Sequence, residues 1–168
     1  MGFWKTVPPA ASVLFVCLGN ICRSPTAEAV LRAAALRAGV ADALRIDSAG
    51  IGGWFAGSPP DRRAIQAARR RGYNLTALRA RQVTVDDFAR FGWILAMDRS
   101  NLTALEAIRP ADYRGHLGLF LDLAPELGLR EVPDPYYGGL EGFDQVLDLV
   151  EAGSRALLAR LSPGRLSI

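Results

Sequence analysis

Apolar runs alternate along the chain with longer segments whose apolar residues recur at helical spacing, and this alternation predicts strands followed by helices. The apolar runs that we expect to be strands are 12–17, 44–49, 91–97 and 116–121. The expected helices are 26–38, 59–71, 99–108 and 141–161. Strands that alternate with helices form a parallel sheet covered on both faces, so the pattern predicts an α/β fold.

Composition indicates a single globular unit. The 168 residues are 50% apolar and contain no linker, repeat or low-complexity tract, so we expect residues 1–168 to form one domain, with 1–11 as a flexible tail. The net charge is only +3, although arginines cluster between 62 and 81. Tyr73 is the one aromatic residue in that stretch, whereas nucleic-acid surfaces interleave basic and aromatic side chains. The stretch therefore indicates a solvated helix face and no nucleic-acid partner.

The sequence predicts neither a membrane partner nor a bound metal. No apolar stretch reaches membrane-spanning length and no signal-peptide pattern opens the chain, so we expect a cytoplasmic location. His116 is the only histidine, and Cys17 and Cys22 are the only cysteines, so no metal-ligand spacing occurs. We therefore expect no metal and no cofactor.

The segment that follows the first predicted strand carries the most specific chemistry. The strand 12–17 ends in Cys17, the chain turns through Gly19 and Asn20, and Pro25 opens an alanine-rich helix. Backbone N–H groups in such a loop and at the start of the helix point into one small volume, where they bind anions. The order strand, cysteine, loop and helix therefore predicts an anion site with a thiol at its floor.

Arg23, six residues after Cys17, completes this predicted site. Its guanidinium can donate two parallel hydrogen bonds to a phosphate or similar oxyanion. The positive field of the helix start and of Arg23 favours the thiolate form of Cys17, which is the nucleophilic form. The alternative is that Cys17 and Cys22 are small buried apolar residues at a strand end. We favour a thiolate that attacks phosphorus.

A thiolate that displaces an alkoxide or phenoxide needs an acid to protonate the leaving oxygen. Asp134 is the candidate, because Pro133 and Pro135 on either side restrict where its carboxyl group points. Tyr136 and Tyr137 follow and can form a wall for an aromatic leaving group. The alternative is a proline-rich turn that Asp134 merely caps. Nothing local in the sequence brings residue 134 to residue 17.

The expected topology supports a site at the carboxyl ends of the strands. Ligands of open parallel sheets bind there, at the point where the strand order reverses. Cys17, Ser48 and Asp98 lie at or near the ends of the first three predicted strands. The topology and the cysteine loop therefore predict the same location.

Two distant segments together resemble the low molecular weight protein tyrosine phosphatases. Residues 17–25 read Cys-x-Gly-Asn-x-Cys-Arg-Ser-Pro, and residues 134–136 read Asp-Pro-Tyr. The likeness runs in order over about 12–160, with further matching segments at 47–50, 53–54, 60–63, 80–82 and 96–102. The resemblance implies a four-stranded parallel sheet with helices on both faces, of the flavodoxin-like, phosphotyrosine phosphatase I-like class.

The resemblance also implies a two-step hydrolysis of phosphotyrosine in proteins. Cys17 is then the nucleophile, Arg23 and the loop amides bind the phosphate, and Asp134 is the general acid and base. The amides assigned to phosphate binding are those of Leu18, Gly19, Asn20, Ile21, Cys22 and Ser24. Phosphotyrosine proteins, a tyrosine kinase among them, are the implied partners, and phosphate-like oxyanions are the implied inhibitors.

Supporting roles follow from the same resemblance. Ser24 is expected to hydrogen-bond the Cys17 sulfur, and Ser48 to hold Asn20 in its strained turn. Cys22 is the expected redox partner of Cys17 in a local, reversible disulfide. The residues expected to line the slot for the substrate ring are Trp54, Tyr136 and Tyr137.

One departure and three alternatives remain open. Leu78 stands where family members often carry a histidine that supports the loop asparagine, which puts that network in doubt. Arsenate reductases of this fold use further cysteines, and none follows Cys22. Relatives that act on phosphoarginine carry a small polar residue in place of Ile21. A catalytically silent phosphotyrosine-binding module would have no need of Asp134.

Overall fold

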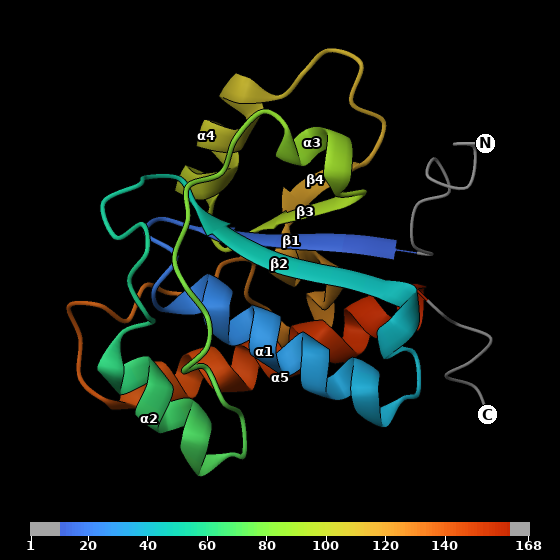
Figure 1. Cartoon of the computed structure of the whole chain (residues 1–168). Helices are drawn as coiled ribbons and strands as arrows, with labels where there is room; N and C mark the ends of the chain where they lie inside the picture. Colours follow the sequence, from blue (N-terminus) through green and yellow to red (C-terminus); the bar gives the residue numbers. More distant parts are fainter. Residues whose placement is uncertain (1–10, 162–168) are drawn as a thin grey trace.

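A computed structural model describes residues 11–161 and places the strands in one sheet (Figure 1). The strand order is β2-β1-β3-β4, and every neighbouring pair is parallel. The strands are β1 (Ala11–Cys17), β2 (Leu44–Gly50), β3 (Trp93–Ala96) and β4 (His116–Leu119). The predicted four-stranded parallel sheet is therefore confirmed.

Helices cover both faces of this sheet (Figure 1). One face carries α1 (Arg23–Arg37), α2 (Arg62–Arg70) and α5 (Glu141–Leu161). The other face carries α3 (Asp87–Arg90) and α4 (Arg99–Ile108). Three short 3₁₀ helices complete the described chain: η2 (Ala41–Ala43), η3 (Phe120–Leu123) and η4 (Pro125–Leu127). This is the three-layer α/β architecture that the alternation of strands and helices predicts.

The central strand β1 is buried along its whole length because both of its faces pack against helices. Val13 and Phe15 join the apolar cluster under α1, α2 and α5, whereas Leu14 and Val16 join the cluster under α3 and α4. The ring of Phe15 meets that of Phe120 edge to face, with centroids 5.0 Å apart. This continuous apolar run holds Cys17, the last residue of β1, at a fixed place.

Several predicted boundaries shift for local reasons. The helix predicted at 59–71 begins at Arg62, because the Asp61 side chain accepts a hydrogen bond from the Arg63 N–H and caps it. The helix predicted at 26–38 begins earlier, at Arg23, and includes Pro25 in its first turn.

The fourth strand ends sooner than predicted. It stops at Leu119, because the next residues turn into η3. The short helix α3 had no counterpart in the prediction. Of the predicted tail 1–11, only Ala11 is described, and it begins β1.

The strand order places the carboxyl end of β1 where the chain direction around the sheet reverses. From β1 the chain moves to one side for β2, then crosses β1 to reach β3 on the other side. The loops that follow the neighbouring strands β1 and β3 therefore lead to opposite faces of the sheet. Open α/β sheets form their ligand sites between two such loops. In the described part of the chain, no helix is long and apolar enough to cross a membrane.

Candidate active site

The loop that follows β1 is a tight turn around the start of α1. Asn20, at its centre, has a φ of 59°, in the left-handed region that few residues other than glycine adopt. The end of β2 passes directly beneath it, because a Cβ atom on Gly50 would lie only 2.9 Å from the Gly19 carbonyl carbon. Gly50 thus allows the loop and β2 to approach as closely as they do.

Hydrogen bonds from three parts of the chain hold Asn20 in this conformation. Its Nδ2 donates to the hydroxyl groups of Ser24 (2.8 Å) and Ser48 (3.0 Å). Its Oδ1 accepts from the Arg81 N–H at 3.0 Å. The Ser48 hydroxyl in turn donates to Glu28 Oε1 at 2.7 Å. The side-chain amide of Asn20 is therefore fully engaged and buried.

This network answers the doubt that Leu78 raises. Leu78 is half-buried against the apolar core, and the Asn20 amide is held without it by Ser24, Ser48 and the Arg81 N–H. Sequence reasoning found Ser48 but missed Glu28. Glu28 lies five residues after Arg23 on α1, one turn and a half further on, so helical spacing could have placed it behind the loop.

We expect Asn20→Ala to lower kcat by about 10²-fold, because a misplaced loop misorients the reacting groups. The change removes two donors and one acceptor and leaves alanine at a positive φ. Steady-state kinetics with p-nitrophenyl phosphate measures the effect. Asn20→Gly is the matched control, since glycine accepts the positive φ but restores no hydrogen bond. Recovery of activity in the glycine variant would show that backbone strain, and not the network, matters.

Cys17 lies at the floor of the loop, and its side chain is buried. Its Sγ atom is 3.0 Å from the Ser24 hydroxyl oxygen, the contact expected from the sequence. Cys22 is a free thiol in the same region, and its side chain is also buried. Burial raises the pKa of the Cys22 thiol well above its usual range, and the Asp61 carboxylate raises it further. Cys22 therefore stays protonated at neutral pH.

The two cysteines should differ in reactivity. We expect iodoacetamide at pH 7 to alkylate Cys17 in preference to Cys22, because only a thiolate reacts readily and the raised pKa of Cys22 keeps it a thiol. Raising the pH to 9 should not make Cys22 reactive, because its raised pKa keeps the thiol protonated. Peptide mass spectrometry reads the site of modification, and labelling in guanidinium chloride controls for detection of both peptides. Equal labelling of the native protein at pH 7 would contradict this assignment.

Arg23 lies behind the loop and is almost inaccessible, with 2% of its surface exposed. Its Nη1 donates to Asp98 Oδ2 at 2.6 Å and to the Val132 carbonyl at 3.0 Å. Burial disfavours its charge, but the Cys17 thiolate and the Asp98 carboxylate outweigh that cost, so the pKa of Arg23 is raised. The guanidinium is therefore a permanent cation with a fixed orientation.

Asp98 is a site residue whose part sequence reasoning did not assign. It lies two residues after β3 and caps α4 by accepting the Asn101 N–H at 2.8 Å, while its other oxygen holds Arg23. A carboxylate that does both fixes the guanidinium with respect to the sheet.

Asp134 lies on the loop before α5, and the fold brings it to the cysteine loop. Its Oδ2 is 3.6 Å from Arg23 Nη2, and its Oδ1 accepts from the Tyr136 N–H at 3.1 Å. Its side chain is 39% exposed, so solvent reaches the carboxyl group. The chain around Val132 is tied to the residue after β3, because the Val132 N–H donates to the Met97 carbonyl. The fold thus brings Asp134 to the loop of Cys17 and Arg23, although Asp134 is far from both in the sequence.

These residues line a cleft of about 320 Å³. Its walls carry the predicted Trp54, Tyr136 and Tyr137 and a further ring, Phe55, that sequence reasoning missed. Trp54 and Tyr137 are strongly exposed at the rim. Tyr136 packs under the Arg63 guanidinium, whose Cζ atom lies 5.5 Å from the centroid of the Tyr136 ring. The remaining lining residues are Cys17, Leu18, Gly19, Ile21, Cys22, Arg23 and Asp134. The cleft therefore has a polar floor and an aromatic mouth.

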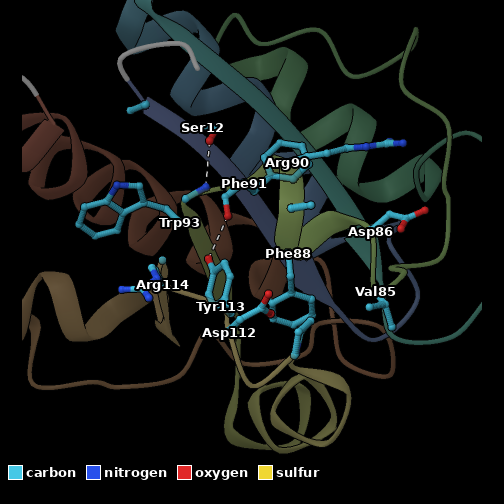
Figure 2. Close-up of a pocket in the computed structure, with 15 residues that line it drawn as sticks. Ser12, Val85, Asp86, Phe88, Arg90, Phe91, Trp93, Asp112, Tyr113 and Arg114 are labelled. Carbon is cyan, nitrogen blue, oxygen red and sulfur yellow. Dashed lines mark hydrogen bonds between the residues drawn. The ribbon is translucent and has the colours of Figure 1, made fainter. Parts of the chain in front are cut away.

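A larger hollow of about 620 Å³ lies at the opposite, amino ends of β1 and β3 (Figure 2). Phe88, Trp93 and Tyr113 line it, and Ser12 accepts a hydrogen bond from the Gly92 N–H at its edge (Figure 2). It contains none of the predicted site residues. Among residues 11–161, no group of three or more His, Cys, Asp and Glu side chains is arranged to hold a metal ion. The candidate site is therefore the smaller cleft above Cys17.

Comparison with known proteins decides the family. The profile of the family described as low molecular weight phosphotyrosine protein phosphatase matches residues 12–165. The chain belongs to this family. A low molecular weight protein-tyrosine-phosphatase of Bacillus subtilis, YfkJ, is 43% identical over 150 residues, covering 89% of this chain and 95% of that protein.

Solved structures of the family share the fold. A protein tyrosine phosphatase from Entamoeba histolytica, with Hepes in its active site, superposes with a TM-score of 0.87 at 37% identity. The match covers 92% of this chain and 98% of the amoebal one. A Drosophila arginine phosphatase, DARP, superposes with a TM-score of 0.82 at 32% identity, over 88% of this chain and 96% of its own. The fold alone therefore does not decide between phosphotyrosine and phosphoarginine.

Proposed function

We propose that this protein hydrolyses phosphotyrosine in proteins through a cysteinyl-phosphate intermediate. The observation that carries the proposal is the meeting of Cys17, Arg23 and Asp134 in one cleft with aromatic walls. Family membership supports the same activity. The residue roles below follow from the geometry of that cleft.

In the first step the Cys17 thiolate attacks phosphorus in line with the departing phenol oxygen. The sulfur–phosphorus bond forms as the phosphorus–oxygen bond breaks, and Asp134 gives its proton to the phenol oxygen. Arg23 and the N–H groups of residues 18–24 hold the equatorial oxygens, where negative charge develops. Asp98 keeps Arg23 in the orientation that this needs.

In the second step the Asp134 carboxylate takes a proton from water as that water attacks phosphorus. The sulfur–phosphorus bond breaks, phosphate leaves, and the thiolate is restored with the help of the Ser24 hydroxyl at 3.0 Å. Asp134 has its proton again, so one turnover consumes one water and releases phosphate and a phenol. The 39% exposure of its side chain gives the attacking water access.

The aromatic mouth favours tyrosine over serine. A phenyl ring reaches from the loop floor to Phe55, Trp54 and Tyr136, whereas the short side chain of phosphoserine leaves its backbone against the rim. Ile21, buried in the lining, offers the ring an apolar surface. Phosphoarginine is the second candidate, because the Drosophila arginine phosphatase shares the fold. Ile21 favours the flat ring over the polar guanidinium.

The test is hydrolysis of three matched peptides that differ only in phosphotyrosine, phosphoserine or phosphoarginine. We expect kcat/KM to be highest for phosphotyrosine, by about 10²-fold or more over phosphoserine, since buried apolar contacts discriminate on this scale. Trp54→Ala should reduce the preference for tyrosine, and Val85→Ala, an exposed apolar residue outside the cleft, is its control. A faster reaction with phosphoarginine would assign the second candidate instead.

Protein partners and inhibitors follow from this chemistry. We propose phosphotyrosine proteins, a tyrosine kinase among them, as substrates, and phosphate-like oxyanions as competitive inhibitors. The sulfonate buffer in the active site of the Entamoeba phosphatase supports the second statement. A reversible disulfide between Cys17 and Cys22, absence of a nucleic-acid partner and a cytoplasmic location stay predictions.

A further inference from the structure

A hollow of about 560 Å³ lies beside the outer edge of β2, away from the catalytic cleft. Four arginines line it: Arg32 from α1, Arg45 from β2, Arg81 from the segment after α2, and Arg90 from the end of α3. Ile46, Asp47 and Phe91 complete its walls. We call this hollow the arginine cleft. It gathers guanidinium groups from four separate parts of the chain.

Only two of the four arginines are neutralised. Arg32 donates to Glu28 from two nitrogens, and Arg81 pairs with Asp47 and Asp87. Within residues 11–161, Arg45 and Arg90 make no ion pair and no side-chain hydrogen bond. Figure 2 shows the Arg90 side chain extending away from the ring of Tyr113. Two exposed cations thus border the cleft without a partner.

The shape and chemistry fit a small phosphorylated ligand. The volume is within the range of sites that hold small molecules, and buried Ile46 and Phe91 give an apolar floor. Guanidinium groups donate in the bidentate geometry that phosphoryl oxygens accept. We propose that the arginine cleft binds a phosphate-bearing small anion, of the size of a short polyphosphate or a nucleoside phosphate, and that its occupancy alters the catalytic loop.

Hydrogen bonds join the two sites. Arg32 holds Glu28, Glu28 accepts from Ser48, and Ser48 accepts from Asn20 at the centre of the catalytic loop. Burial raises the pKa of Glu28, while hydrogen bonds from Ser48 and Arg32 oppose that effect, so Arg32 helps to stabilise the Glu28 carboxylate. An anion that draws Arg32 away leaves Glu28 without its cation and loosens Ser48. Binding in the arginine cleft therefore lowers kcat.

The experiment separates the two sites. Wild-type protein saturated with orthovanadate, which occupies the catalytic cleft, is titrated with sodium tripolyphosphate by calorimetry at low salt. One tripolyphosphate should bind per chain. Arg45→Gln/Arg90→Gln should weaken that binding by at least about tenfold, because each arginine supplies charge-assisted hydrogen bonds. Arg69→Gln/Arg70→Gln removes the same charge from exposed positions on α2 and should leave the affinity unchanged.

Two results overturn the proposed site: no binding by the vanadate-saturated wild type, or equal weakening in both double variants. The second result would mean general attraction to a basic protein. A parallel titration with ATP distinguishes the sources of the phosphoryl group. Tighter binding of ATP assigns a contact to the nucleoside, and equal binding assigns the affinity to the phosphates alone.

A kinetic arm tests the coupling and rests on the proposed function. At saturating p-nitrophenyl phosphate, tripolyphosphate should lower kcat of the wild type about fivefold, at the low end of typical allosteric coupling. Arg45→Gln/Arg90→Gln should keep its own kcat in the presence of tripolyphosphate, while competition at Cys17 raises KM in both proteins. An unchanged wild-type kcat overturns the coupling. If no hydrolysis occurs at all, the proposed function fails, and the calorimetry still decides the arginine cleft.

Discussion

Cys17→Ser should abolish hydrolysis of p-nitrophenyl phosphate, with kcat reduced on the order of 10⁵-fold or more. A serine hydroxyl keeps the shape of the side chain but is far less nucleophilic, and among residues 11–161 the side chain at position 17 is hydrogen-bonded to the Ser24 hydroxyl, which is not a base. The contact that stabilises the sulfur, from the Ser24 hydroxyl at 3.0 Å, suits a negatively charged thiolate and does nothing to activate an alcohol. The loss should appear in kcat, because the oxyanion donors that bind substrate remain.

The loop that carries Cys17 also provides controls for this loss of activity. Cys22→Ser removes the other cysteine, whose raised pKa keeps it a thiol, and should retain most activity. Calorimetry should show that Cys17→Ser still binds orthovanadate, since Arg23 and the loop amides are intact. Full activity in Cys17→Ser, or an equal loss in Cys22→Ser, would contradict the assignment of the nucleophile.

The fold was predictable because each strand and helix has a pattern of apolar residues that can be recognised within its own segment of the sequence. The run that forms β1 is apolar on both faces, which is typical of a central parallel strand, and the helix over 99–108 has the predicted bounds. The predicted boundaries of the elements were wrong where a particular side chain, and not the apolar pattern, decided where an element begins. At α2, the Asp61 cap displaced the expected start beyond both prolines, since a capped helix begins after its cap.

The site was predictable in part. The residues of the loop from Cys17 to Ser24 are contiguous in sequence, so their geometry follows from one turn and one helix start. Phe55, Glu28 and the role of Asp98 were missed, because each acts through a contact that only the packed structure defines. Sequence spacing places Asp98 just after a strand, but it does not show that the Asp98 carboxylate faces Arg23.

Leu78 illustrates the limit of argument by resemblance. The absence of a histidine there suggested a weakened loop, yet Asn20 is held by the Arg81 N–H and by a chain that runs through Ser48 to Glu28. A comparison of side chains between family members does not reveal a hydrogen bond that comes from a backbone N–H group. The network therefore survives the loss of one member, and the same backbone contact ties the loop to the segment that borders the arginine cleft.

Asp134→Asn should lower kcat by about 10²–10⁴-fold, the usual contribution of a general acid. Asparagine keeps an oxygen that accepts the Tyr136 N–H, so the loop retains its shape while the proton donor is lost. The loss should depend on the leaving group. It should be smaller for p-nitrophenyl phosphate, whose phenolate leaves readily, and larger for phenyl phosphate, which resembles phosphotyrosine.

This dependence on the leaving group separates acid catalysis from a structural effect. Glu131→Gln, which removes an exposed carboxylate from the same loop, is the matched control and should leave both rates near those of the wild type. A folding defect in Asp134→Asn would slow both substrates by the same factor, since it lowers the amount of active enzyme. Equal slowing would thus exclude Asp134 as the acid. A larger slowing for phenyl phosphate would mean that Asp134, which lines the cleft 3.6 Å from Arg23, protonates the departing oxygen.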